Sequence, residues 1–186
     1  LKFFNGFEEF GKVEETVTVK TTSLNEIKGI NPIDFLKMDV QGAELEIMKN
    51  GETKLLNCLA IQLEVSYFPL YENQPTFGDI DLYLRKKDFV PHLFLENKKW
   101  SIAPTVFNNN FRVPGNQLLE SDIVYIRNPL SLEKMTDDEL KKMAAVVHYS
   151  FKSYDLCVFI LIEMAKRKLV DSSAHQQYID NIKLYP

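Results

Sequence analysis

The sequence predicts an α/β fold in which a mostly parallel sheet is built from alternating strands and helices. The run 33–40 (IDFLKMDV) is mainly apolar, which is typical of a strand buried inside a parallel sheet. The run 58–65 (CLAIQLEV) has the same character. Between these runs, Gly42 predicts a tight turn, and the amphipathic segment 43–50 predicts a helix that stops at Gly51.

Two weaker elements precede the first of these strands. The segment 14–23 (EETVTVKTTS) alternates valine with threonine and lysine, which predicts a half-exposed strand near a sheet edge. Ser23 is expected to cap a short helix at 24–28, with Glu26 placed as in a capping box. We assign no structure to residues 1–15.

After the second strand the same alternation continues. A long polar loop inside a compact domain tends to be functional. The last strand follows such a loop without a helix between, which predicts an antiparallel end to the sheet. The predicted loop, helix, strand, long loop and last strand lie at 66–75, 76–88, 89–95, 96–119 and 121–127.

The last part of the sequence changes in character and predicts three helices. The first is capped by Thr136, and the others lie at about 154–169 and 173–182. We therefore divide the chain into an α/β part, 1–130, and a helical appendage, 131–186. Helices this apolar need a partner, either the sheet or another chain, and a homodimer through them is one such arrangement.

Composition excludes several classes of function. A formal net charge of −4 without a basic cluster argues against nucleic-acid binding. Cys58 and Cys157 are isolated, which argues against a disulfide framework and favours the cytoplasm. No apolar stretch approaches the roughly 20 residues that cross a bilayer. Because the chain starts with Leu1 and shows no signal peptide, we expect it to be a piece of a longer protein.

Several segments resemble one protein family. The segment 33–44 (IDFLKMDVQGAE) resembles the hallmark of the FkbM-type methyltransferases, a hydrophobic residue, Lys, a hydrophobic residue, then Asp-Val-x-Gly-x-Glu. The segment 63–65 (LEV), the loop through Tyr71 and the segment 121–125 (SDIVY) resemble the family pattern in the same order. The resemblance covers about residues 13–127.

The resemblance implies a class I, Rossmann-like methyltransferase fold with an antiparallel final strand, and S-adenosyl-L-methionine as cofactor. It also implies methyl transfer to an oxygen or nitrogen of a small-molecule or saccharide acceptor. The first half of such a domain carries a Gly-rich turn after a strand, which Gly6 and Gly11 do not match. We therefore expect this chain to be the C-terminal part of the domain and to lack most of the cofactor pocket.

Three residues are catalytic candidates. Asp39 ends the first strand, where ligands gather in open parallel sheets, and could orient the acceptor or act as a base. Its alternative role is to cap the turn at Gly42. Lys37 shares the strand face of Asp39, which predicts an ion pair with Asp39 or Glu64, or a role in tuning Asp39. Glu64 is the second strand-end acid and is either catalytic or a cap.

Asp39, Gly42 and Glu44 are the residues that we expect to contact the cofactor. The alternative for Glu44 is to complement the helix dipole, since it lies in the first helical turn. Asp39, Glu44 and Glu64 could instead bind a hard cation through their oxygens, although we expect no metal.

Tyr71, Asn116 and Gln117 are the candidates for acceptor binding. Tyr71 lies in the loop after the second strand, and Asn116 and Gln117 lie in the long loop. Tyr71 could instead have a packing role only, as loop tyrosines often do. The alternative for the whole chain is a non-catalytic interaction or dimerisation module derived from the methyltransferase fold.

Overall fold

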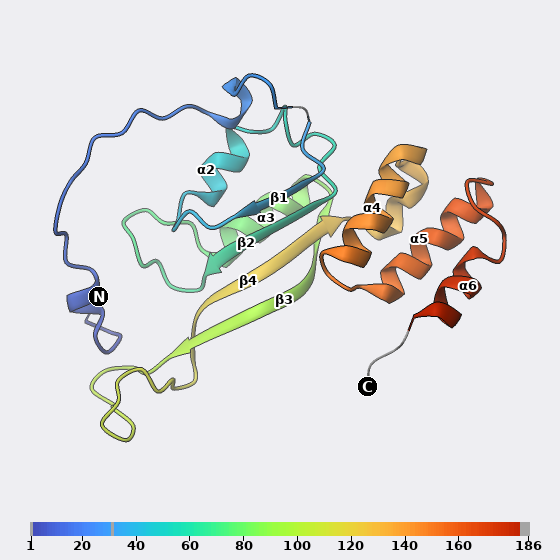
Figure 1. Ribbon diagram of the computed structural model, residues 1–186. Helices are drawn as coiled ribbons and strands as arrows, with labels where there is room; N and C mark the ends of the chain where they lie inside the picture. Colours follow the sequence, from blue (N-terminus) through green and yellow to red (C-terminus); the bar gives the residue numbers. More distant parts are fainter. Residues whose placement is uncertain (1, 31, 183–186) are drawn as a thin grey trace.

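The computed structural model of the protein describes residues 2–30 and 32–182 (Figure 1). Within these ranges four strands form one sheet in the order β1-β2-β4-β3. Helices lie on both sides of the sheet. The strands are β1 (Phe35–Met38), β2 (Ala60–Ser66), β3 (Phe89–Trp100) and β4 (Gln117–Arg127).

The expectation of a mostly parallel sheet is only partly confirmed. β1 and β2 are parallel, whereas β4 is antiparallel to both β2 and β3, between which it lies. The strands β1, β2 and β3 therefore run in one direction and β4 runs in the other. Because β4 follows β3 through a loop, it returns antiparallel, and its insertion between β2 and β3 gives two antiparallel pairings.

The predicted helices are confirmed, most of them with tighter limits. Ser23 and Glu26 form the predicted capping box, but the turn that they begin is a short 3-10 helix. The long polar loop is also shorter than predicted, at 101–116, because β3 and β4 extend into the predicted loop from its two ends. The helices are α1 (Phe7–Phe10), η1 (Leu24–Glu26), α2 (Glu44–Lys49), α3 (Phe77–Lys86), η2 (Pro129–Lys134), α4 (Asp137–Tyr149), α5 (Tyr154–Lys166) and α6 (Ala174–Asn181). In the part of the chain that the structure describes, no helix has the length and hydropathy needed to cross a membrane.

Alternate residues of β4 enter two apolar cores, one on each face of the sheet. Ile123 and Tyr125 belong to the first core, which α2 and α3 cover. Val124 and Ile126 belong to the second core, to which α4 and α5 contribute side chains such as Ile160. The sheet thus supplies an apolar partner for the C-terminal helices.

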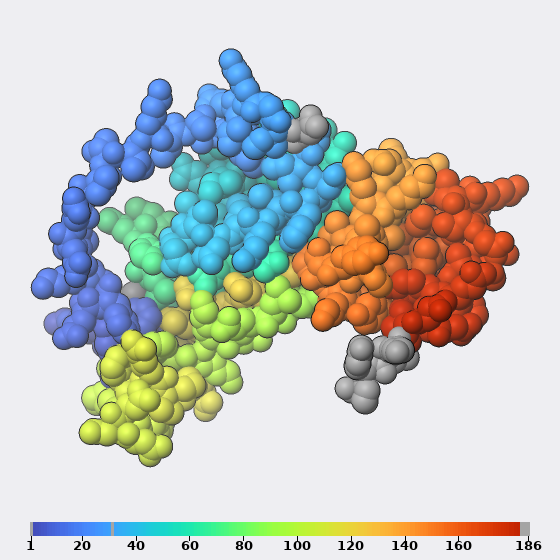
Figure 2. Space-filling view, viewed as in Figure 1, coloured from blue at the N-terminus to red at the C-terminus, as the bar shows by residue number. Residues whose placement is uncertain are grey.

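The strand predicted at 14–23 is wrong. Residues 12–23 have no regular secondary structure, and Val13, Val17 and Val19 are 78%, 67% and 70% exposed. Figure 2 shows this segment as a single thickness of chain that stands away from the sheet. An extended segment becomes a strand only when another strand pairs with it, and the alternating sequence does not supply that partner.

Aromatic packing joins the N-terminal residues to the β3–β4 hairpin. The indole of Trp100 lies 5.4 Å from the ring of Phe7, and its Nε1 donates to the carbonyl of Asn5 at 2.8 Å. Phe10 packs against Phe111 in the hairpin loop, with 6.0 Å between ring centroids. Residues that the sequence left unassigned are thus held by the far end of the sheet.

We expect Ile160→Ala to destabilise the whole molecule by about 2–5 kcal/mol, because Ile160 is fully buried in the core that β4 and the helices share. Phe159, its neighbour on α5, is 47% exposed, and Phe159→Ala should cost less than about 1 kcal/mol. Urea unfolding followed by far-ultraviolet circular dichroism measures both. Separate unfolding of sheet and helices in the Ile160→Ala variant would contradict the shared core.

Candidate functional site

The carboxyl ends of β1 and β2 lie side by side and carry the two predicted strand-end acids. Met38, the last residue of β1, is paired with Leu63 in β2, so Asp39 and Glu64 follow at the same edge. The side chain of Asp39 is exposed, whereas Glu64 is only 7% exposed. This edge is the candidate functional site.

Gln41, which the sequence analysis missed, connects three of the predicted residues. Its Nε2 donates to Oδ1 of Asp39 at 3.0 Å and to Oε2 of Glu64 at 2.9 Å. Its Oε1 accepts a hydrogen bond from the hydroxyl of Tyr71 at 3.1 Å. The backbone of Gln41 has φ 56°, a left-handed conformation that directs the side chain from the turn.

An amide side chain suits this position because it has two N–H donors and one carbonyl acceptor. The donors meet the two carboxylates of Asp39 and Glu64, which would otherwise repel each other across the edge. The carbonyl oxygen accepts a hydrogen bond from Tyr71 in the loop after β2. The only sequence signal for this role was the position of Gln41 between Asp39 and Gly42 in the turn.

Lys98 is a second residue that the sequence analysis missed. Its ammonium forms an ion pair with Glu64 and lies 3.7 Å from Oε2 of Glu120. Burial and the nearby negative charge of Glu64 raise the pKa of the Glu120 carboxyl. The hydrogen bond to Glu64 raises the pKa of the Lys98 ammonium, so this cation is held firmly between two acids.

The ion pair predicted for Lys37 is wrong. Lys98 contacts Glu64 in its place, and no ion pair joins Lys37 to an acid of the described residues. Lys37 lies on the same face as Phe35 but is exposed, so water satisfies its charge and no protein partner is needed.

Glu44 holds the turn between β1 and α2. Its side chain is only 4% exposed. Oε1 accepts from the backbone N–H of Val40 at 3.2 Å, and Oε2 accepts from that of Gly42 at 2.9 Å. Turn capping, which was the alternative for Asp39, is therefore carried out by Glu44, and a cofactor contact of Glu44 stays a prediction.

Gly42 packs tightly against the loop after β2. Its φ is 107°, and a Cβ at this position would lie 3.1 Å from Cγ of Gln74. Gln74 in turn donates to Oγ of Ser66 at 2.9 Å and accepts from the backbone N–H of Tyr71 at 3.2 Å. The turn and the loop that presents Tyr71 are thus built against each other.

Asn116 and Gln117 are not brought into this network. Asn116 is exposed in the loop 101–116, and Gln117 opens β4, where its side chain donates to the carbonyl of Leu118. Among the described residues, no three His, Cys, Asp or Glu side chains are placed to hold a metal ion. The role of Asn116 and Gln117 in acceptor binding stays a prediction.

Two backbone donors at this edge are not available to S-adenosylmethionine. The N–H groups of Val40 and Gly42, which could bind an anionic group, are already used by Glu44. Asp39 is the one predicted cofactor contact with an exposed side chain. The edge therefore offers a carboxylate and an exposed tyrosine, a set suited to a hydroxyl or an amine.

We expect Gly42→Ala to destabilise the fold by about 1–3 kcal/mol, because a side chain there meets both an unfavourable φ and Gln74. Gly78→Ala is the matched control. Gly78 lies in α3, where the nearest atom to an added Cβ is Oγ1 of Thr76 at 3.9 Å, an ordinary contact, so alanine should stabilise the helix by up to about 1 kcal/mol. Thermal unfolding checks both signs, and equal effects would contradict the tight contact at Gly42.

Glu44→Gln should cost about 1–3 kcal/mol, because an amide places its NH₂ group against one of two buried N–H donors. Glu46, in the same helix, is exposed, and Glu46→Gln should change stability by no more than about 0.5 kcal/mol. Denaturant titration measures the difference. Similar stability of the two variants would mean that Glu44 does not hold the turn.

Comparison with known proteins finds one family model that matches part of the chain. Residues 2–91 match the family described as the methyltransferase FkbM domain. No curated protein and no solved structure gives a match. The matched range includes Asp39, Gln41, Glu64 and Tyr71 and ends within β3, before Lys98. This match agrees with the resemblance to FkbM-type methyltransferases and indicates a methyltransferase in general.

Proposed function

We propose that this chain is part of an S-adenosylmethionine-dependent methyltransferase that acts on an oxygen or nitrogen of a small-molecule or saccharide acceptor. The family match supports methyl transfer. The observation that carries the assignment of the site is the exposed carboxylate of Asp39, fixed by Gln41 at the edge where parallel strands end.

Asp39 is suited to handle the acceptor. A methyl acceptor has to be aligned for in-line attack, and a hydroxyl or amine also has to lose a proton. One oxygen of Asp39 is held by Gln41, and the exposed side chain leaves the other oxygen free to accept a hydrogen bond from an acceptor. The proton of the acceptor would pass to this carboxylate.

Gln41 and Tyr71 position this acid. The amide of Gln41 keeps Asp39 apart from Glu64, whose charge is already compensated by Lys98. Tyr71 is 51% exposed, and its hydroxyl donates to Gln41, so its ring and oxygen are available to an acceptor. Asn116, from the hairpin loop, and Gln117, from the start of β4, would also contact the acceptor.

The second candidate function is a non-catalytic interaction or dimerisation module. It is favoured by the use of the turn N–H groups within the chain and by apolar side chains that the helices leave exposed. Phe159, Ile162 and Ile179 are 47%, 36% and 40% exposed. A homodimer through these helices would cover them.

Calorimetric titration with S-adenosylmethionine and its demethylated product separates the two functions. We expect weak or no binding by this chain, and binding by a longer protein that carries further sequence before Leu1. An absence of binding by both proteins would overturn the methyltransferase proposal and leave the interaction module.

In a longer protein that binds the cofactor, we expect Asp39→Asn to lower the rate of methyl transfer by about 100-fold or more. Cofactor affinity should stay within about twofold, because the change acts on the acceptor side. Gln41→Leu should lower the rate by about tenfold, because it removes the hydrogen bond that positions Asp39 but keeps the carboxylate itself.

Asp34→Asn is the matched control for this prediction. Asp34 lies just before β1 at the opposite end of the strand and pairs with Lys142 on the surface. Its replacement should leave the rate of transfer unchanged. Transfer by Asp39→Asn at the rate of Asp34→Asn would remove Asp39 from the mechanism.

A further inference from the structure

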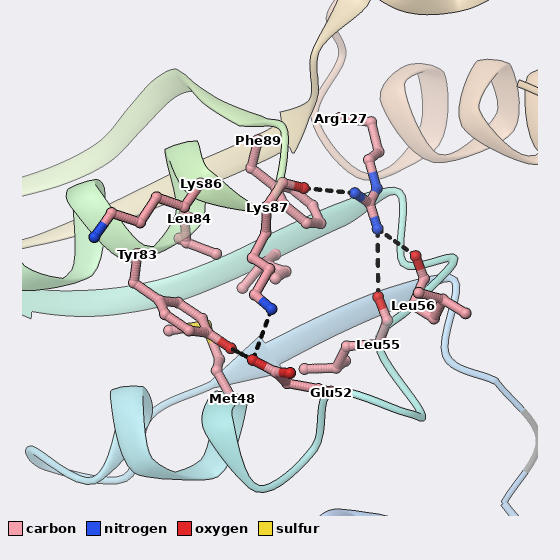
Figure 3. A pocket seen from close by; sticks show the side chains of 11 residues that line it. Met48, Glu52, Leu55, Leu56, Tyr83, Leu84, Lys86, Lys87, Phe89 and Arg127 are labelled. Carbon is pink, nitrogen blue, oxygen red and sulfur yellow. Dashed lines mark hydrogen bonds and ion pairs between the residues drawn. The ribbon is translucent and has the colours of Figure 1, made fainter. Parts of the chain in front are cut away.

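A cavity of about 320 Å³ lies at the edge of the sheet opposite Asp39. It is bounded by the segment before β2, the end of α3, the start of β3 and the end of β4, as Figure 3 shows. All these points are at the amino ends of β2 and β3, whereas Asp39 follows the carboxyl end of β1. The cavity is therefore separate from the candidate functional site.

The floor of the cavity is apolar. Met48 and Leu84 are each only 1% exposed in the structure as a whole, yet both face this space. Water in contact with such a floor is unfavourable compared with an apolar ligand, and the volume lies at the low end of the range for ligand sites. The apolar lining residues are Met48, Leu55, Leu56, Ile61, Leu84 and Phe89.

Three polar side chains meet at one side of the cavity. The hydroxyl of Tyr83 donates to Oε1 of Glu52 at 2.9 Å, and Nζ of Lys87 lies 2.8 Å from the same oxygen. Figure 3 shows these side chains pointing toward one another beside the apolar floor. A single carboxylate oxygen thus serves both the tyrosine and the lysine.

Arg127 adds a positive charge whose hydrogen bonds go to backbone carbonyls, while the charges of Asp88 and Glu139 act on it from outside the cavity lining. Its guanidinium donates to the carbonyls of Cys58 at 2.7 Å, of Lys87 at 2.6 Å and of Leu56, and it packs over the ring of Phe89 at 4.3 Å. These oxygen acceptors are neutral. Among the residues that line the cavity, three cations, Lys86, Lys87 and Arg127, stand against one acid, Glu52.

We propose that this cavity binds a small monocarboxylate with an apolar chain, of the medium-chain alkanoate class. The chain would lie against Met48, Leu84 and Phe89, and the carboxylate would lie beside the ammonium of Lys87. The excess of cations over acids in the cavity lining favours an anionic head group over a cationic one. The inference does not depend on methyl transfer, because none of these residues belongs to the Asp39 edge.

The first test is calorimetric titration of the chain with alkanoates from butanoate to decanoate, and with the corresponding amides. Affinity should rise about fourfold for each added methylene until the cavity is full, and then level off. Each carboxylate should bind about two- to fivefold more tightly than its amide. In methyl NMR spectra, Met48 should shift while Met143, which belongs to the second core, should not.

We expect two charge variants at the cavity to change octanoate affinity in opposite directions. Lys87→Gln should weaken octanoate binding by about two- to fivefold, because it removes the nearest cation. Glu52→Gln should tighten it by a similar factor, because Lys87 loses its competing carboxylate.

Lys49→Gln is the control, since Lys49 is exposed and follows Met48 in the sequence but is not among the residues that line the cavity. This variant should bind octanoate like the unchanged chain. Circular dichroism of these exposed-site variants checks that each is folded. Equal affinity for octanoate and octanamide, equal effects at Lys49 and Lys87, or an unshifted Met48 would each overturn the proposal.

Discussion

The candidate site depends on one buried carboxylate. Glu44 accepts hydrogen bonds from the backbone N–H groups of Val40 and Gly42 and so fixes the turn that joins β1 to α2. The buried position of this charge is stable because two donors satisfy it. With the turn fixed, Gln41 is held in its left-handed conformation and its amide lies between Asp39 and Glu64. The position of the exposed Asp39 carboxylate thus depends on the buried carboxylate of Glu44.

The strand β4 gives the molecule its two-sided construction. It lies between β2 and β3 and sends Ile123 and Tyr125 to one core and Val124 and Ile126 to the other. The same insertion places Glu120 opposite Ser66 at the end of β2. The acids of two strands therefore gather at one edge, and the long β3 supplies Lys98 between them. Sheet topology accounts for a charge arrangement that sequence spacing does not reveal.

Local patterns predicted the turn at Gly42, the helix after it and the strand-end position of Asp39, because each depends on neighbouring residues. They did not predict the role of Gln41, whose partners Glu64 and Tyr71 lie far along the chain. The ion pair assigned to Lys37 failed for the same reason: the lysine that reaches Glu64 lies on a distant strand. The valine alternation at 14–23 indicated a strand, but a strand also needs a partner segment, which the local pattern does not identify.

The exposed segment 12–23 also has a mechanical consequence. Its beginning is held by the packing of Phe7 against Trp100, and its end by the backbone bond from Asn25 to Asn50. An extended chain fixed at both ends acts as a strap with a limited reach. The strap therefore limits how far the β3–β4 hairpin can swing from the body of the sheet. A single cleavage within this segment would remove this limit and leave the packing of Phe4 against Phe68 as a remaining link between the N-terminal residues and the loop after β2.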